Sequence, residues 1–173
     1  MKKEIGFTLV ELMVTLSLAA IVISVAIPSF NTMIQNNRLI SQTNQLVASL
    51  NHARSEAIGR GNTVTICSSS DQITCGGGWN TGWITFVDIN ANGAFYGASD
   101  TLLKVNQGLG GNNTLKGTGN TDSISYLSTG FTDLAASASF SLCDTRGNSY
   151  GHQVSLSTVG RLSSSTAPVS CTP

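Results

Sequence analysis

Phe7-Thr8-Leu9-Val10-Glu11-Leu12 opens an apolar run that continues to Phe30 and contains one ionisable side chain, Glu11. As a helix that rises about 1.5 Å per residue, residues 7–30 are long enough to cross the roughly 30 Å hydrocarbon core of a bilayer. Lys2 and Lys3 precede the run, and basic residues next to a membrane span tend to stay in the cytoplasm. The pattern therefore predicts a single-pass membrane protein with a cytoplasmic N-terminus and most of the chain outside.

A cleaved secretory signal is the alternative interpretation of this run. Its apolar region would be residues 12–23, and Ser24-Val25-Ala26 would serve as the small-residue cleavage site. Glu11 argues against this alternative, because a carboxylate near the membrane centre costs about 2.5–3.5 kcal/mol and implies a partner. The second argument is that the helical pattern continues beyond the apolar run.

Apolar residues recur mostly three or four positions apart over residues 33–58, with polar residues between them, and Gly59 then provides a stop. One helix is therefore expected from about residue 7 to 58, apolar on all sides in its first half and amphipathic in its second. Pro28 is expected to bend this helix or open a local gap, because proline cannot donate a hydrogen bond to the Ser24 carbonyl.

Gly6 followed by Phe7-Thr8-Leu9-Val10-Glu11 resembles the prepilin cleavage and methylation signature of type IV pilins and type II secretion pseudopilins. The resemblance implies that a prepilin peptidase cuts between Gly6 and Phe7, which makes residues 1–6 a leader, and that Phe7 is then N-methylated. It also implies an inner-membrane precursor with a periplasmic globular part. Other major and minor pilins and an inner-membrane platform would be its partners on the way to a pilus at the cell surface.

Cleavage would create a terminal ammonium on Phe7, one helical turn from Glu11. In a water-poor helix bundle an unpaired carboxylate is costly, so this ammonium, from the same or a neighbouring subunit, is the expected partner of Glu11. Such a pair would set the axial register of a filament. The sequence therefore predicts Glu11 as an assembly residue.

The composition excludes a general attraction to nucleic acid. The chain has 9 basic and 9 acidic residues, and charged residues make up 10% of it, against roughly 25% in ordinary soluble domains. With zero formal net charge, any nucleic-acid site would have to be a local patch. Hydrophobic residues make up 40%, which argues against a disordered chain.

The four cysteines are Cys67, Cys75, Cys143 and Cys171. An even number behind an export-type N-terminus favours disulfides in an oxidising compartment. Three pairings exist on paper, and proximity in the sequence suggests Cys67–Cys75 and Cys143–Cys171. A zinc site is the rival interpretation, but the sequence contains no CxxC motif or Cys/His cluster.

Beyond residue 58 the pattern changes from helical spacing to alternation of polar and apolar residues. Six strands are expected, at residues 63–67, 82–87, 101–105, 122–127, 139–143 and 153–157. Antiparallel strands of this kind need a cover on one face, and the amphipathic residues 31–58 offer it. The sequence thus predicts an α+β globular domain over residues 31–173, with helix packed on an antiparallel β-sheet. Residues 108–120, rich in glycine and asparagine, are expected to form a long surface loop.

A second resemblance covers scattered pieces of most of the chain, and it is to the GspH/FimT group of minor pilins. The pieces are Ala53-Arg54-Ser55-Glu56-Ala57, Val64-Thr65-Ile66-Cys67, Gly82-Trp83-Ile84-Thr85-Phe86-Val87-Asp88, Cys143-Asp144-Thr145-Arg146-Gly147 and Gly160-Arg161. The resemblance implies the type IV pilin-like fold. It also implies a minor subunit that assembles into or primes a type IV pilus, or a minor pseudopilin of a type II secretion system.

Some FimT-type members bind DNA during natural transformation through a C-terminal Gly-Arg-x-Arg stretch. The matching positions here begin with Gly160 and Arg161, but the second arginine is replaced by Ser163. Arg161, with Arg146 and Lys116 as supports, remains a candidate for contacting the phosphates of double-stranded DNA.

Asp88, Asn90, Asn92 and the following glycine have the D-x-[DN]-x-[DN]-G spacing of a calcium loop. The twelfth position, which should be a bidentate glutamate, is Ser99. The alternative is a hairpin turn in which the Asp and Asn side chains bond their own backbone.

The remaining residue types do not suggest an enzyme. His52 and His152 belong to no motif, and no serine lies in a G-x-S-x-G elbow. Neither a catalytic set nor a cofactor is expected. Of the two tryptophans, Trp83 is expected in the core and Trp79 is the better candidate for an exposed ligand-binding aromatic.

Overall fold

The computed structural model describes residues 6–119, 121–166 and 170–171, and the chain divides into two compact units, Met1–Asn37 and Arg38–Pro173. Residues 1–5, which form most of the expected leader, lie outside the described residues. One helix, α1 (Leu9–Arg60), belongs to both units. It begins and ends two residues later than the sequence pattern predicts.

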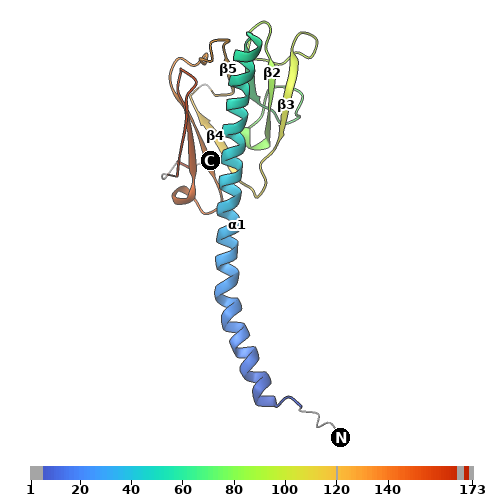
Figure 1. Cartoon of the computed structure of the whole chain (residues 1–173), viewed down its shortest axis with the longest axis vertical. Coiled ribbons are helices and arrows are strands. Elements are labelled where there is room, and N and C mark those ends of the chain that lie inside the picture. Colours follow the sequence, from blue (N-terminus) through green and yellow to red (C-terminus); the bar gives the residue numbers. More distant parts are fainter. Residues whose placement is uncertain (1–5, 120, 167–169, 172–173) are drawn as a thin grey trace. The chain divides into compact units, whose positions relative to one another are not determined.

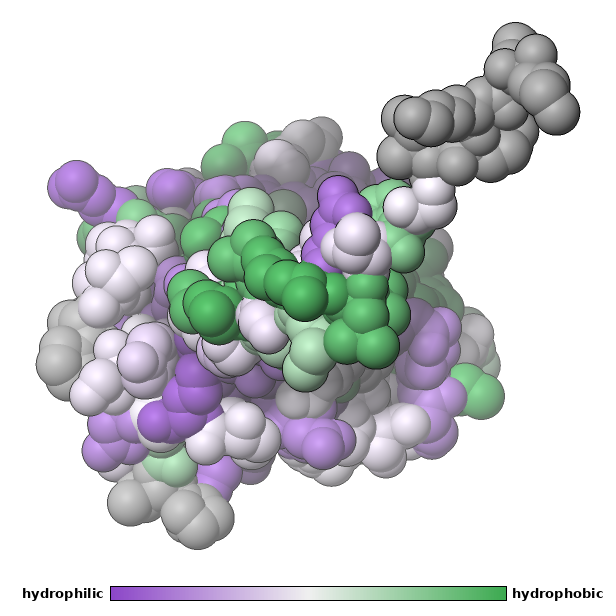
Figure 2. Space-filling model, turned by 90° about the horizontal axis from the view of Figure 1, so that it is seen from below, coloured by the Kyte–Doolittle hydropathy of each residue, from purple (hydrophilic) through white to green (hydrophobic). Residues whose placement is uncertain are grey.

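Polar side chains in the apolar part of α1 satisfy themselves within the helix. The hydroxyls of Thr15, Ser17, Ser24 and Thr32 donate to carbonyls three or four residues earlier, at 2.7–3.1 Å. The helix continues without a break through Pro28, although proline cannot donate the usual hydrogen bond to the Ser24 carbonyl. Figure 2 shows apolar side chains gathered over the helical segment seen end-on, unlike the mixed polar surface of the globular unit.

Within the part of the chain that the structure describes, eight strands in two antiparallel sheets follow α1, where the sequence predicts one sheet. The first sheet has the order β3-β2-β1-β5 and the second the order β4-β6-β7-β8. Their bounds are β1 Val64–Ser68, β2 Gly82–Val87, β3 Thr101–Gln107, β5 Ser123–Tyr126, β4 Thr114–Thr118, β6 Ala138–Cys143, β7 His152–Leu156 and β8 Leu162–Ser165. Two short 3-10 helices, η1 (Trp79–Thr81) and η2 (Asn148–Tyr150), complete the described elements. The α+β prediction, a long helix packed on antiparallel sheet, is confirmed.

One hydrophobic core joins the second half of α1 to both sheets (Figure 1). From the helix it takes a stripe at three- and four-residue spacing that includes Leu46, Leu50, Ala53 and Ala57, all at most 1% exposed. The small Ala53 and Ala57 let the sheets approach the helix closely. Burying each leucine contributes about 1.5–3 kcal/mol, so this stripe fastens the helix to the sheets.

The first sheet is buried on its other face as well. Cys67, Ile84 and Phe86 form a second cluster there, with Cys75 and Phe95 packed against it. Because loops cover this face, every residue of β1 and β2 is buried. In β1 and β2, polar and apolar residues therefore alternate along the strand, but buried and exposed residues do not.

Two strands were not predicted, and one of them corrects the expected loop at residues 108–120. β4 lies within that segment, and its Leu115 is buried and paired with Leu142. Just before β4, the Gln42 amide donates to the Gly110 carbonyl (3.0 Å) and accepts from the Asn113 amide (2.7 Å). The segment has too few apolar residues for its strand to be recognised in the sequence, and pairing with β6 holds that strand in place.

The interpretation of Trp79 as an exposed aromatic is wrong. Trp79 is 5% exposed, its Nε1 donates to the Thr121 carbonyl (2.8 Å), and its ring meets Phe140 edge-on at 5.0 Å. The 3-10 turn η1 rotates the ring inward between the two sheets. Trp83 is fully buried, as predicted.

Candidate functional site

A side-chain N-cap fixes the residue at which α1 begins. The backbone N–H of Glu11 donates to Thr8 Oγ1 at 3.2 Å, which makes Thr8 the N-cap and Glu11 the third helical residue. A Thr-x-x-Glu sequence at this place is the pattern of a capping box, a signal that the sequence analysis missed. Gly6 and Phe7 precede the helix and are exposed, so the expected cleavage site lies outside regular structure.

The first half of α1 exposes a large apolar surface. Leu9, Leu16, Ile23 and Phe30, among other side chains of this segment, are each more than half exposed. Within the described residues, α1 is the one helix long and apolar enough to cross a membrane, by length and composition. Because soluble monomers rarely leave such a surface uncovered, this segment requires lipid or other helices around it.

All four cysteines form disulfides. Cys67 is joined to Cys75 and Cys143 to Cys171, with Cα–Cα distances of 5.6 and 5.8 Å. This is the pairing that proximity in the sequence suggests, and it rules out the zinc interpretation.

The calcium candidate is a hydrogen-bonded turn. Asp88 is 1% exposed, and its carboxylate accepts from Thr65 Oγ1 (2.8 Å) and from the backbone N–H groups of Asn92 (3.2 Å) and Gly93 (2.9 Å). The side-chain oxygen of Asn90 accepts from the Asn92 N–H (3.3 Å). The side-chain oxygen of Asn92 accepts from the Ala94 N–H (2.9 Å). These oxygens serve the chain's own backbone, which favours the turn over a cation site.

The structure does not bring the three candidate DNA-binding cations together. Arg146 is paired with Asp144, whose Oδ2 accepts from Arg146 Nε at 2.8 Å, and its guanidinium stacks 4.2 Å from the centre of the Tyr150 ring. Lys116 and Arg161 are both exposed. Lys116 is on β4 and Arg161 directly precedes β8, the two opposite edges of the second sheet. Three strand spacings separate these edges by roughly 14 Å.

Arg161 lies in the tight hairpin between β7 and β8. The Gly160 N–H donates to the Ser157 carbonyl (2.9 Å), and the Arg161 N–H donates to Ser157 Oγ (3.1 Å). Ser137, Ser155 and Ser163, with Ser157 and Leu156, line a shallow groove of about 360 Å³ beside Arg161. The neighbourhood of this cation is therefore rich in hydroxyls and poor in other charges.

Arg54 forms the most extensive side-chain contact between the helix and the loops. Its Nε donates to the Gly130 carbonyl (3.0 Å), Nη1 to that of Gly160 (3.0 Å) and Nη2 to that of Val159 (3.1 Å). Both glycines have positive φ, and a Cβ on Gly160 would lie 2.3 Å from the Gly130 carbonyl oxygen. In the sequence Gly160 is recognisable only as part of the possible DNA-binding stretch, because 106 positions separate it from Arg54.

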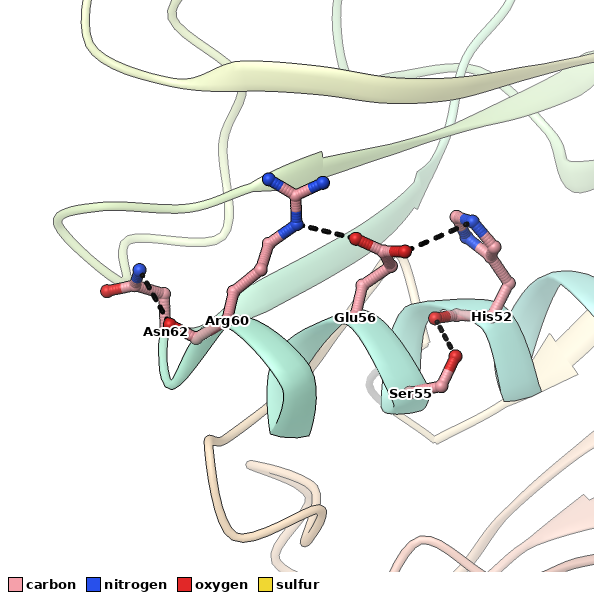
Figure 3. A network of polar contacts seen from close by, with 5 residues as sticks. All are labelled: His52, Ser55, Glu56, Arg60 and Asn62. Carbon is pink, nitrogen blue, oxygen red and sulfur yellow. Dashed lines mark hydrogen bonds and ion pairs between the residues drawn. The ribbon is translucent and has the colours of Figure 1, made fainter.

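A short ion-pair series follows the exposed side of α1 (Figure 3). Arg60 Nε lies 2.5 Å from a Glu56 carboxylate oxygen, and His52 Nε2 lies 3.8 Å from the other. The hydrogen bond from Arg60 lowers the pKa of Glu56 from its usual value. Ion pairs at this spacing support a helix only weakly, so we assign the series to the surface of the helix.

A long N-terminal helix, exposed and apolar at its start and packed on antiparallel sheets at its end, is the architecture of pilin-like filament subunits. The chain belongs to the family described as type II transport protein GspH, whose pattern matches residues 42–160. The prokaryotic N-terminal methylation motif matches residues 1–27. The chain is thus a minor pilin or pseudopilin with a membrane-anchored precursor.

Two solved proteins share the fold. The type IV minor pilin FimU of Pseudomonas aeruginosa is 23% identical with a TM-score of 0.66, over 80% of this chain and 98% of FimU. The minor pseudopilin EpsH from the type 2 secretion system of Vibrio cholerae is 13% identical with a TM-score of 0.52, over 74% of this chain and 96% of EpsH. No curated protein sequence matches the chain significantly.

Proposed function

We propose that this chain is a minor subunit of a type IV pilus, which it enters or primes through α1. The observation that carries the proposal is the exposed apolar segment from Leu9 to Phe30, preceded by Gly6-Phe7 and interrupted by one carboxylate, Glu11. The greater similarity to FimU than to EpsH supports the pilus over the secretion machine.

Three functional parts follow from this proposal. Residues 1–6 are a leader that a prepilin peptidase removes at the inner membrane, and residues 7–30 are the membrane and assembly helix. Residues 31–173 form the periplasmic domain that reaches the cell surface with the filament. The positively charged N-terminus keeps the leader cytoplasmic, and the two disulfides suit an oxidising compartment.

Glu11 is the assembly residue in this proposal. After cleavage the Phe7 ammonium, from the same or a neighbouring subunit, neutralises the Glu11 carboxylate in the helix bundle. A charge in so apolar an environment is costly when unpaired and tolerable when paired. The Thr8 cap fixes where the helix begins, and so keeps the Phe7 terminus within one turn of Glu11.

Filament recovery tests the proposal. An epitope-tagged full chain, expressed in its own cells, should co-purify with sheared pili, and Glu11→Ala and Glu11→Gln should each lower its recovery at least tenfold. Glu56→Gln, which alters an exposed carboxylate elsewhere on α1, is the matched control and should be recovered normally. Normal recovery of both Glu11 variants would contradict the pairing. Recovery that depends on secretion genes and not on pilus genes would assign the chain to a type II system.

DNA binding is a second candidate, supported by the exposed Arg161 beside a hydroxyl-lined groove. The pairing of Arg146 with Asp144 removes one of its supporting cations. Any binding to duplex DNA should therefore be weak and fall steeply with salt, because few phosphates could be neutralised.

A further inference from the structure

Four apolar side chains stay exposed around the C-terminal end of α1. They are Ile58 on the helix, Leu127 and Phe131 in the loop after β5, and Val159 in the β7–β8 hairpin, between 40% and 53% exposed. We name these four residues the crown. Single exposed apolar residues are ordinary, whereas a cluster of them indicates an interaction surface.

Backbone contacts place the crown residues side by side. The Leu127 N–H donates to the Phe131 carbonyl (2.8 Å), and the Thr132 N–H donates to the Thr158 carbonyl (2.9 Å). The loop after β5 and the β7–β8 hairpin, which belong to different sheets, therefore lie next to each other.

Arg54 then fixes both loops to the helix. Its guanidinium binds the carbonyls of Gly130, Val159 and Gly160 at once. A Cβ on Gly130 would lie 2.8 Å from Ile58 Cδ1, so the loop rests directly against the helical member of the crown. The crown is thus held in place before any partner binds.

We infer that the crown docks the globular domain of a neighbouring subunit in the filament, an inference that rests on the proposed function. A surface that is already ordered loses little conformational entropy on binding, and apolar centres of interfaces contribute most of the affinity. The patch is small compared with the roughly 1,200–2,000 Å² of a stable free complex. It suffices when α1 already holds the subunits together at high effective concentration.

The charges around the crown favour a protein partner. Three of the five N–H donors of Arg54 are occupied by carbonyls, and its guanidinium is a half-buried cation beside the crown. Arg161 is exposed and follows Val159 by two residues, which places a cation at the rim. A matching surface would have an apolar centre and a carboxylate at its edge. A membrane surface would call for Trp, Tyr or Lys at this level, and duplex DNA would call for several cations.

Photo-crosslinking and filament recovery test the inference in the full chain, expressed in its own cells. A photo-reactive amino acid at position 131 should crosslink, within sheared pili, to a second protein with an N-methylated pilin-type N-terminus. The same probe at Tyr96, which is 58% exposed in the loop before β3, is the matched control and should give at least tenfold less of that product.

Substitutions provide the second arm. Phe131→Ser combined with Val159→Ser should lower recovery in pili at least tenfold without a change in melting temperature. If the double variant unfolds, Phe131→Gln takes its place and should lower recovery in the same way. Tyr96→Ser should leave recovery unchanged. Normal recovery of the crown variants, while Glu11→Gln is excluded, would overturn the docking surface and leave the proposed function intact. Crosslinking of position 131 to duplex DNA in place of a pilin-type subunit would also overturn it.

Discussion

Arg54 connects α1 to loops from both sheets through three hydrogen bonds from a charged donor. Hydrogen bonds to charged groups typically contribute about 1.5–3 kcal/mol each, and carbonyls that regain water recover part of this energy. A single side chain therefore holds the helix and two loops together, which in most domains requires several buried apolar residues. Gly130 and Gly160 both have positive φ, and a Cβ at either position would lie 3.1–3.2 Å from Arg54 Nε.

Arg54→Met should lower the unfolding free energy of the globular unit by about 2–4 kcal/mol, because three carbonyls lose their donor. Urea unfolding of the chain from residue 38 onward, followed by circular dichroism, measures this difference. Arg60→Met is the control and should lower the unfolding free energy much less, since an exposed ion pair such as that with Glu56 contributes little to stability. Equal effects of the two substitutions would show that the Arg54 contacts do not stabilise the fold.

At the scale of single residues, the sequence suggests what a side chain could do chemically more readily than which residues it contacts. The role of Glu11 stays a prediction, and it is made because a carboxylate in an apolar run has a recognisable cost. Trp79 was misjudged because its partner, the Thr121 carbonyl, is fixed by a turn, and the contact of Arg146 with Asp144 was missed for the same reason. The Arg54 contacts join residues 76 to 106 positions apart, and no local pattern reports them.

At the scale of elements, α1 and six strands could be predicted because their residues repeat with helical or alternating spacing. β4 and β8 could not, since Thr114–Thr118 and Leu162–Ser165 each contain one large apolar residue. Their partners β6 and β7 supply the hydrogen bonds that hold them. The division into two sheets was missed as well, because the alternation of residues within a strand does not report which strands pair with each other.

The disulfide between Cys67 and Cys75 belongs to this scale, because it fastens the loop after β1 over the buried outer face of the first sheet. Replacing both cysteines by alanine should cost about 2–4 kcal/mol, through the freer unfolded chain and the loosened cover. The urea midpoint of the double variant should fall, while far-ultraviolet circular dichroism stays that of the native sheets. An unchanged midpoint would show that the loop is held by its other contacts.

At the scale of the whole molecule, the proposed assembly segment and the proposed docking surface lie in different units. The unit Met1–Asn37 contains the apolar segment that needs covering, and the unit Arg38–Pro173 has its own core, disulfides and loops. Changes in the first unit should affect entry into a filament without unfolding the second. Changes at the crown should affect which neighbour is accepted.

Processing at Gly6–Phe7 is the step on which this account depends, because only cleavage frees the ammonium that Glu11 is expected to meet. Intact-mass measurement of the chain extracted from membranes tests it directly. The predicted result is a mature protein that begins with N-methylated Phe7 and retains the whole of α1. A protein that begins at Ile27 would show that the apolar run is a cleaved secretory signal, and would contradict assembly through this helix.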